Sequence, residues 1–167
     1  MRSRAAAAGS ALFFALAPGT VAGLAPWALT GWDAGAAPIA VRWLGAILVV
    51  AGAAVLLQAF ARFVREGLGT PAPVAPTAHL VVGGLYRYVR NPMYLAVVAT
   101  ILGQALLLWR PVLVAYAAVV AATTAAFVRG YEEPTLRRQF GGDYDAYRAA
   151  VPGWWPRRTP WPGSTGS

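Results

Sequence analysis

The sequence predicts an all-α, polytopic membrane protein with about four transmembrane helices and a C-terminal amphipathic helix at the membrane interface. Hydrophobic residues make up 58% of the chain and charged residues only 12%. The mean hydropathy of +0.53 is far above that of soluble domains. The apolar residues also form runs of roughly 20 residues, which is the length that crosses a hydrocarbon core as a helix. We expect one membrane domain over residues 1–167.

The charged residues exclude several classes of site. All 14 cationic side chains are arginine, so a Schiff-base lysine is absent, and there is no cysteine for a disulfide, a thiolate metal site or a nucleophile. We expect no metal centre. The formal charge of +8 could suggest nucleic acid, but membrane proteins carry arginine at helix ends for topological reasons. We therefore expect membrane lipids as partners and no nucleic acid.

The first two spans form a predicted N-terminal hairpin over residues 1–63. An apolar run covers residues 11–32, after a start that carries Arg2 and Arg4. A cleaved signal peptide is the alternative. Pro18 and Pro26 interrupt the run, however, and a short Gly/Ala loop leads directly into a second apolar run over residues 39–63. This continuity favours two membrane helices.

A second hairpin is predicted after a long break. Glycines and prolines between residues 64 and 82 prevent a regular helix, so we expect a loop or a re-entrant connection there. A third span follows over residues 93–109. Arg110 and Pro111 make a tight break before the fourth span, over residues 112–128. These two helices should pack antiparallel.

The chain after Arg129 turns polar and predicts an amphipathic helix. Apolar side chains recur there every three or four residues, at Leu136, Phe140, Tyr144, Tyr147 and Val151. Gly141 and Gly142 should bend this helix. Trp154, Trp155 and Trp161 suit the membrane interface, and we expect residues 157–167 to form a flexible tail.

Arginine positions orient the predicted spans. Two arginines, Arg42 and Arg110, fall on one side of the membrane, and the other twelve fall on the opposite side. The positive-inside tendency then places both termini and the segment 64–91 in the cytoplasm. The alanine-rich, lysine-free composition suggests a bacterial genome, so we expect the bacterial inner membrane.

Two polar blocks at span ends are the candidates for chemistry. The first, residues 79–94, holds the only histidine, paired glycines, tyrosines and arginines, and the second is residues 129–133. Glu132 and Glu133 point about 100° apart on a helix, so we expect one of them to face a common site. They could equally cap the next helix, where Pro134 suits the first turn. The arginines and tyrosines could also be interface anchors.

The two blocks resemble a known superfamily. The string GGLYRYVRNPMY at residues 83–94 is followed, one hairpin later, by EEPxLxxxFGxxYxxY at residues 132–147 and by VPxW at residues 151–154. This order is similar to that of the isoprenylcysteine carboxyl methyltransferase and phospholipid methyltransferase superfamily. The resemblance covers residues 77–156, whereas the first two spans share only their apolar character.

The resemblance implies a membrane methyltransferase that uses S-adenosyl-L-methionine and methylates a lipophilic acceptor arriving through the bilayer. Carried over by motif, the cofactor-binding residues would be His79, Leu80, Gly83, Tyr86, Arg90, Asn91, Pro92, Tyr94, Glu132 and Glu133, with Arg129 and Tyr131 close by. Asn91 departs from the pattern, because better-known members have histidine there. The resemblance therefore implies no acid/base role at this position.

The residue types suit this cofactor. A carboxylate of Glu132 or Glu133 could bind its ammonium group, an arginine or backbone N–H groups its carboxylate, and tyrosine rings its sulfonium. Gly83 and Gly84 would let the backbone approach the ligand. Arg129, Glu132 and Arg90 are the catalytic candidates: an arginine would orient the acceptor, and His79 or a glutamate could take a proton from an ammonium acceptor.

Two other functions fit parts of the sequence. A sterol-type membrane reductase would use NADPH in a similarly placed pocket, and a scaffold or transporter subunit would explain the hydropathy without an enzyme. The spacing between the two polar blocks favours the methyltransferase. An isoprenylcysteine-like carboxylate and a lipid amine both remain open as acceptors, and the oligomeric state is also open.

Overall fold

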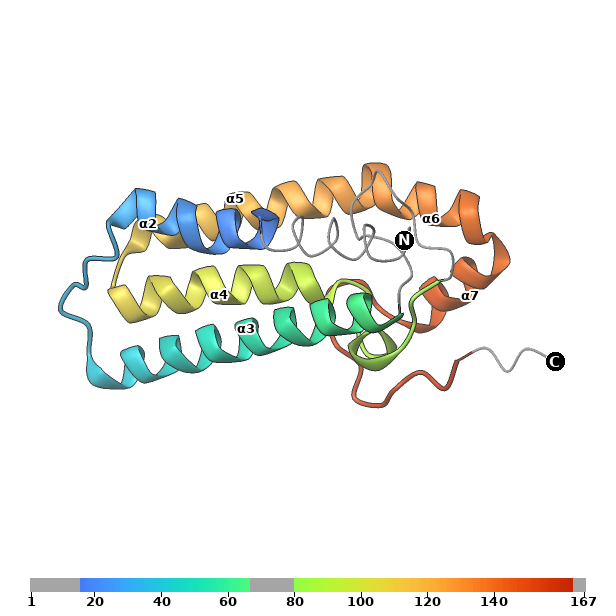
Figure 1. Ribbon diagram of the computed structural model, residues 1–167, viewed down its shortest axis with the longest axis horizontal. Helices are drawn as coiled ribbons and strands as arrows, with labels where there is room; N and C mark the ends of the chain where they lie inside the picture. Colours follow the sequence, from blue (N-terminus) through green and yellow to red (C-terminus); the bar gives the residue numbers. More distant parts are fainter. Residues whose placement is uncertain (1–15, 67–79, 164–167) are drawn as a thin grey trace.

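A computed structural model describes residues 16–66 and 80–163 of the chain. All regular structure in these residues is helical, which confirms the all-α prediction for this part of the chain. Figure 1 shows long helices side by side along one axis, with the short helices α6 and α7 gathered at one end. The polar C-terminal elements thus lie beyond one end of an apolar bundle.

Helix α3 (Ile39–Glu66) is the second predicted span. Its segment Ile39–Ala59 is long and apolar enough to cross a membrane. Large apolar side chains project outward along it: Ile39 is 70% exposed, and Leu57 is 67% exposed. Such a surface is stable against lipid rather than water.

Helices α4 (Pro92–Leu108) and α5 (Pro111–Phe127) form the predicted antiparallel hairpin. A proline starts each helix, where the missing N–H costs no hydrogen bond. Between them the chain reverses at Trp109, whose φ of +54° is left-handed. The Arg110 Nε atom donates to the Asp33 carbonyl oxygen at 2.9 Å, which ties this turn to the end of the first hairpin.

Two of the helices could span a membrane by length and composition, at Ile39–Ala59 and Pro111–Phe140. Helix α4 is apolar but has 17 residues, or about 25 Å of rise. The first expected span, residues 11–32, lies partly outside the described residues. Its described part contains a π-helical turn, η1 (Thr20–Leu24), and a short helix, α2 (Ala25–Thr30). These helices support a membrane protein without confirming four spans.

Pro26 accounts for the π turn of η1, and side chains of α4 and α5 bond the carbonyl groups that the turn leaves free. Pro26 has no N–H to donate to the Ala22 carbonyl oxygen, and the wider turn also frees the carbonyl of Val21. The Gln104 Nε2 atom of α4 donates to the Ala22 oxygen at 2.6 Å, and the Tyr116 hydroxyl of α5 donates to the Val21 oxygen at 2.8 Å. These two hydrogen bonds therefore hold the interrupted helix against α4 and α5.

Helices α3 and α4 approach each other closely through glycine. A Cβ atom at Gly45 would lie 2.6 Å from the Gly103 carbonyl oxygen, and one at Gly52 would lie 2.8 Å from the Ala96 carbonyl oxygen. Small residues at such crossings let backbones pack tightly in lipid, where the hydrophobic effect does not drive helices together. These contacts hold the first half of α3 against α4 from Ala96 to Leu107.

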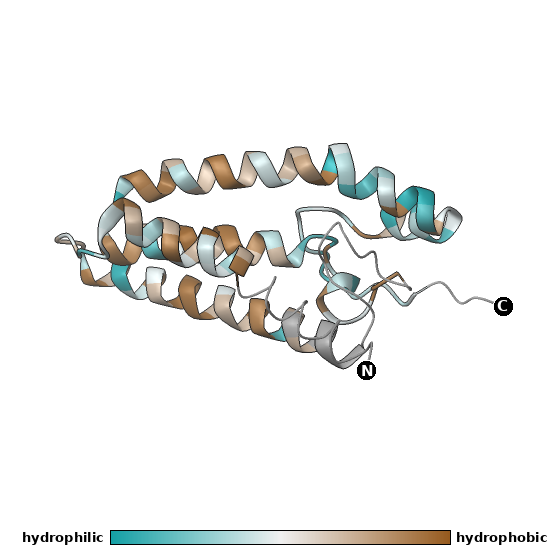
Figure 2. Ribbon diagram, turned by 45° about the horizontal axis from the view of Figure 1, so that its top comes forward, coloured by the Kyte–Doolittle hydropathy of each residue, from teal (hydrophilic) through white to brown (hydrophobic). Residues whose placement is uncertain are grey.

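The predicted amphipathic segment bends where expected. It forms α6 (Glu133–Phe140) and α7 (Gly142–Ala150), and Gly141 between them has a left-handed φ of +52°. The apolar stripe is confirmed as a cluster: the buried side chains Tyr144, Tyr147 and Val151, with Leu136, Phe140, Leu80, Val82 and Trp161 against them. Figure 2 shows hydrophilic residues concentrated on α6 and α7 and apolar ones along the bundle.

Candidate active site

The two polar blocks meet at the end of the bundle, as the sequence predicts. The first block makes a short 3₁₀ helix, η2 (Gly84–Arg87), which Gly84 enters with a left-handed φ of +60°. The backbone then pairs with the C-terminal segment. The Arg90 amide donates to the Pro152 carbonyl at 3.0 Å, and the Asn91 amide donates to the Gly153 carbonyl at 3.2 Å.

The C-terminal segment continues along the first block beyond these contacts. The Arg157 amide donates to the Tyr88 carbonyl, and the Trp161 amide donates to the Arg87 carbonyl, both at 2.9 Å. The Arg87 Nε atom returns a bond to the Trp161 carbonyl at 2.7 Å. Residues 157–161, which we expected in a flexible tail, are thus bound to the site by backbone pairing that residue type alone does not reveal.

Arg90 is the central donor of the site. Its Nη1 atom pairs with the Glu133 Oε1 atom at 2.5 Å and lies 3.1 Å from the Tyr144 hydroxyl, and its Nε atom donates to the Val151 carbonyl at 2.9 Å. Its Nη2 atom lies 3.1 Å from where a Cβ at Gly153 would be. Arg90 therefore joins α6, α7 and the C-terminal segment to the start of α4.

Glu133 has a second cationic partner. The Arg148 Nη2 atom of α7 lies 3.3 Å from its Oε2 atom. The Glu133 and Arg90 side chains are 15% and 13% exposed, whereas the Arg137–Asp145 pair on the outer surface is 62% and 44% exposed. Water screens the inner pair much less than the outer one. This ion pair is a fixed part of the site.

Glu132 contacts the first block through Tyr94. Its Oε2 atom accepts a hydrogen bond from the Tyr94 hydroxyl at 3.0 Å. A π turn, η3 (Val128–Glu132), directly precedes Glu133 in the otherwise continuous helix from α5 to α6. We expected one of the two glutamates to face a common site, but both contact it, because Arg90 and Tyr94 approach them from different positions.

Helix capping does not explain the position of the Glu132 side chain. Its side chain makes no cap hydrogen bond at the start of α6, although Pro134 does occupy the first turn, as predicted. Glu133 lies in that first turn, where its charge favours the helix dipole. The dipole and the ion pair therefore both stabilise Glu133, whereas Glu132 has only the tyrosine partner among the hydrogen bonds described.

Two buried tyrosines of α7, Tyr144 and Tyr147, stay protonated at neutral pH. Burial, with Glu133 nearby, raises the pKa of Tyr144, and burial raises the pKa of Tyr147 above that of a free tyrosine. The Tyr147 hydroxyl donates to the Tyr86 carbonyl at 2.7 Å. The neutral Tyr147 hydroxyl thus bonds the backbone of η2, and the neutral Tyr144 hydroxyl accepts a hydrogen bond from Arg90.

Asn91 has a structural contact. The residue is 5% exposed, and its Nδ2 atom donates to the Gly153 carbonyl at 3.0 Å. An amide neither gains nor loses a proton at accessible pH, so this contact fits the absence of an acid/base role. Asn91 positions the C-terminal segment beside the start of α4.

The other predicted site residues fall into four groups. Pro92 and Tyr86 lie at the site, whereas Leu80 packs in the C-terminal cluster and Gly83 has ordinary extended backbone. His79 lies outside the described residues. Arg129 and Tyr131 are exposed on η3, where Tyr131 stacks on Phe127 at 5.3 Å, and none of the described ion pairs includes Arg129.

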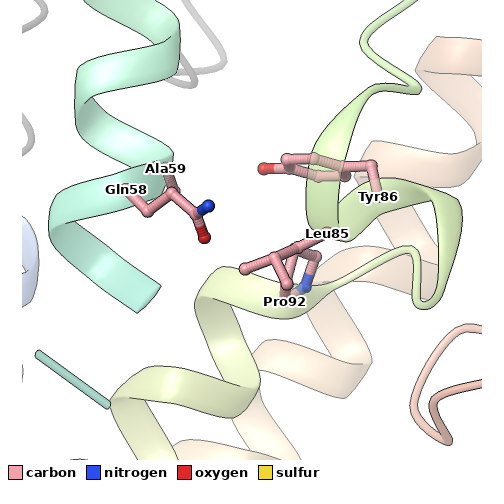
Figure 3. A pocket seen from close by; sticks show the side chains of 5 residues that line it. All are labelled: Gln58, Ala59, Leu85, Tyr86 and Pro92. Atoms are coloured by element: carbon pink, nitrogen blue, oxygen red, sulfur yellow. The ribbon is translucent and has the colours of Figure 1, made fainter. Parts of the chain in front are cut away.

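A small hollow opens between α3 and the first block. Its lining residues are Gln58, Ala59, Leu85, Tyr86 and Pro92. Figure 3 shows the Gln58 and Tyr86 side chains pointing toward each other across it. Gln58 belongs to the second predicted span and was not among the predicted site residues; the available signal was an uncharged polar side chain within an apolar run.

The sequence matches a known family over most of the bundle. The family model described as phospholipid methyltransferase matches residues 40–143, which is more than half of the chain. The chain belongs to the phospholipid methyltransferase family. No curated protein and no solved structure gives a match.

The phospholipid methyltransferase match extends the predicted region. The resemblance rested on residues 77–156, but the match begins at residue 40, so α3 belongs to the family region together with α4, α5 and α6. Helix α3 supplies Gln58 and Ala59 to the hollow. The match ends at residue 143, before Tyr144 and Arg148, the two α7 residues that contact the ion pair of this family member.

Proposed function

We propose that this chain is a membrane enzyme that transfers a methyl group from S-adenosyl-L-methionine to a lipophilic acceptor. The observation that carries the proposal is the joining of the two motif blocks by the Arg90–Glu133 ion pair and the Tyr94–Glu132 hydrogen bond. Membership of the phospholipid methyltransferase family supports this chemistry over that of a reductase or a scaffold.

The residues at the site fit this cofactor. Two carboxylates lie beside a tyrosine hydroxyl and an arginine, and one further guanidinium nitrogen, the Nη1 atom of Arg157, is buried without an acceptor among the described residues. When bound, S-adenosyl-L-methionine supplies an electrophilic methyl group on a sulfonium. We propose that Glu132 holds its ammonium group, since both oxygens of Glu133 are already paired with arginines.

Arg90 acts in this proposal as a positioning residue. All of its described hydrogen bonds run to protein acceptors, so it fixes Glu133 and the C-terminal segment rather than reaching a substrate. Arg129 is exposed on η3 and remains our candidate for orienting the acceptor. A carboxylate acceptor needs no base, whereas an ammonium acceptor must lose a proton, which His79 could take.

The acceptor would reach the site from the bilayer. The hollow between α3 and η2 supports this route, because Ala59, Leu85 and Pro92 give it an apolar wall and Gln58 and Tyr86 give it two polar side chains. We propose four spans, with both termini and the cofactor site on the cytoplasmic side of a bacterial inner membrane. The arginine distribution supports that orientation.

Calorimetry on the detergent-purified protein tests the proposal. We expect saturable binding of S-adenosyl-L-methionine, no binding of NADPH, and loss of binding in the Glu132→Gln/Glu133→Gln double variant. Arg137→Gln, which changes only the exposed pair, is the matched control. Transfer of labelled methyl groups into a lipid extract should then identify the acceptor class. No binding by folded wild-type protein would overturn the proposal.

A further inference from the structure

Arg157 carries a buried donor without an acceptor. Its Nη1 atom is buried, and no hydrogen-bond partner lies within reach among the described residues. The guanidinium group is charged at all accessible pH values and presents its donors in a rigid planar fork. Because a buried, unpaired N–H of a charged group costs free energy, such a group usually has a partner in the working state of a protein.

The backbone places Arg157 beside the candidate active site. Its amide donates to the Tyr88 carbonyl at 2.9 Å, directly after η2. Three residues earlier in the same segment, the Trp154 ring lies 6.5 Å from the ring of Tyr94, whose hydroxyl binds Glu132. The segment that carries Arg157 therefore borders the first motif block, and at Tyr94 it lies next to the residue that bonds Glu132 of the second block.

The nearby carboxylates are already engaged. Glu133 pairs with Arg90 and Arg148, and Glu132 accepts from Tyr94. The other arginine of this border, Arg87, donates its Nε–H to the Trp161 carbonyl. Among the described residues, Arg157 thus carries a buried guanidinium nitrogen that has no hydrogen-bond acceptor.

We propose that Arg157 binds the anionic oxygen group of a ligand at this site. Two ligands of the proposed reaction carry such a group: the methyl donor has a carboxylate, and a phospholipid acceptor has a phosphate. Both present paired oxygens that match the guanidinium fork. The inference rests on the proposed function for its first source, and lipid binding alone can test the second.

The test uses purified full-length protein in a maltoside detergent, which has no phosphate. Wild type, Arg157→Ala, Arg157→Lys and Arg158→Ala are titrated with S-adenosyl-L-methionine and with its decarboxylated form, which lacks the carboxylate. They are also titrated with a short-chain phosphatidic acid and with the matching diacylglycerol. Arg158 is the neighbouring exposed arginine and serves as the matched control. Thermal unfolding of each variant reports on folding.

A carboxylate ligand predicts that Arg157→Ala weakens S-adenosyl-L-methionine binding about 10-fold to 100-fold and leaves binding of the decarboxylated form unchanged. A phosphate ligand predicts the same loss for phosphatidic acid, with none for diacylglycerol. Arg157→Lys should lose less in either case, because it keeps the charge.

Two outcomes overturn the inference. In one, Arg157→Ala binds every ligand as Arg158→Ala does. In the other, it loses all four ligands together with its thermal stability, which would make the side chain structural. Absence of S-adenosyl-L-methionine binding in the wild type would instead refute the proposed function, and phosphatidic acid binding would still decide the role of Arg157.

Discussion

The Tyr94 hydroxyl of α4 donates to the Glu132 carboxylate at 3.0 Å, across two segments that are 38 residues apart in the chain. One residue later, Glu133 pairs with Arg90, which precedes the same helix. Adjacent carboxylates thus bind two different partners at the start of α4. Glu132 is thus held by a neutral hydroxyl donor, whereas Glu133 is paired with a positively charged arginine.

Replacing Glu132 by glutamine should weaken cofactor binding more than it weakens the fold. The amide oxygen can still accept from Tyr94, whereas the negative charge is lost, so we expect affinity for S-adenosyl-L-methionine to fall about 10-fold to 100-fold. Tyr94→Phe keeps the charge and should cost less than about tenfold. Calorimetry measures both, and wild-type affinity in Glu132→Gln would argue against a role in binding.

Replacing Arg90 by alanine should destabilise the protein strongly. The change leaves the partly buried Glu133 without its shorter ion pair and the Val151 carbonyl without its donor, for a loss of about 3 kcal/mol. Arg137→Ala removes the exposed pair and should cost less than about 1 kcal/mol. Denaturation in mixed micelles compares the two, and equal losses would contradict the importance of burial.

The glycine contact between α3 and α4 should tolerate no larger residue. A Cβ at Gly45 would meet backbone atoms of α4, so Gly45→Val should force the helices apart at a cost of about 1–3 kcal/mol. Gly19 has ordinary helical backbone and open space around it. Gly19→Ala should be neutral or slightly stabilising, and thermal unfolding of both variants provides the comparison.

Gln104 and Pro26 should be energetically coupled. Gln104→Leu leaves the Ala22 carbonyl unpaired in the bundle, at a cost of about 1 kcal/mol. Pro26→Ala restores the N–H that can bond this carbonyl within its own helix. The cost of Gln104→Leu should therefore shrink in the Pro26→Ala background, and a double-mutant cycle measures the difference. Additive effects would refute the link between the π turn and Gln104.

Stability should fall at alkaline pH because of the buried tyrosines. The pKa values of Tyr144 and Tyr147 are raised in the folded state, so the unfolded chain loses their protons first, above about pH 10. Folded stability is then constant through neutral pH and declines above that value. The chain has no lysine to titrate in this range. Tyr147→Phe should flatten the decline of the unfolding midpoint between pH 9 and 11.

The bundle could largely be predicted from local sequence signals. Pro92, Pro111 and the apolar runs place α3, α4 and α5 within a few residues of their observed bounds. The stripe that ends at Val151 likewise predicted the C-terminal cluster. These features depend on periodicity and on turn chemistry, which neighbouring residues determine.

The partners within the site could not be predicted in the same way. The choice of Tyr94 for Glu132 and of Arg90 for Glu133 depends on the π turn of η3 and on the angle between helices. The unpaired donor of Arg157 depends on a C-terminal segment that folds back along η2. Motif resemblance named most of the residues that meet, but Gln58, Arg148 and Arg157 carried no motif signal.

The backbone pairing between residues 87–91 and 152–161 also sets the time at which the site can form. A ribosome makes the apolar helices before residues 152–161, so Arg90 and Asn91 must wait for the carbonyl groups of that later segment. Until the C-terminal segment arrives, the guanidinium of Arg90 lacks the Val151 acceptor that orients it. Assembly of the site therefore follows synthesis of residues 152–161, and a nascent chain that ends before them has the bundle helices without these backbone bonds.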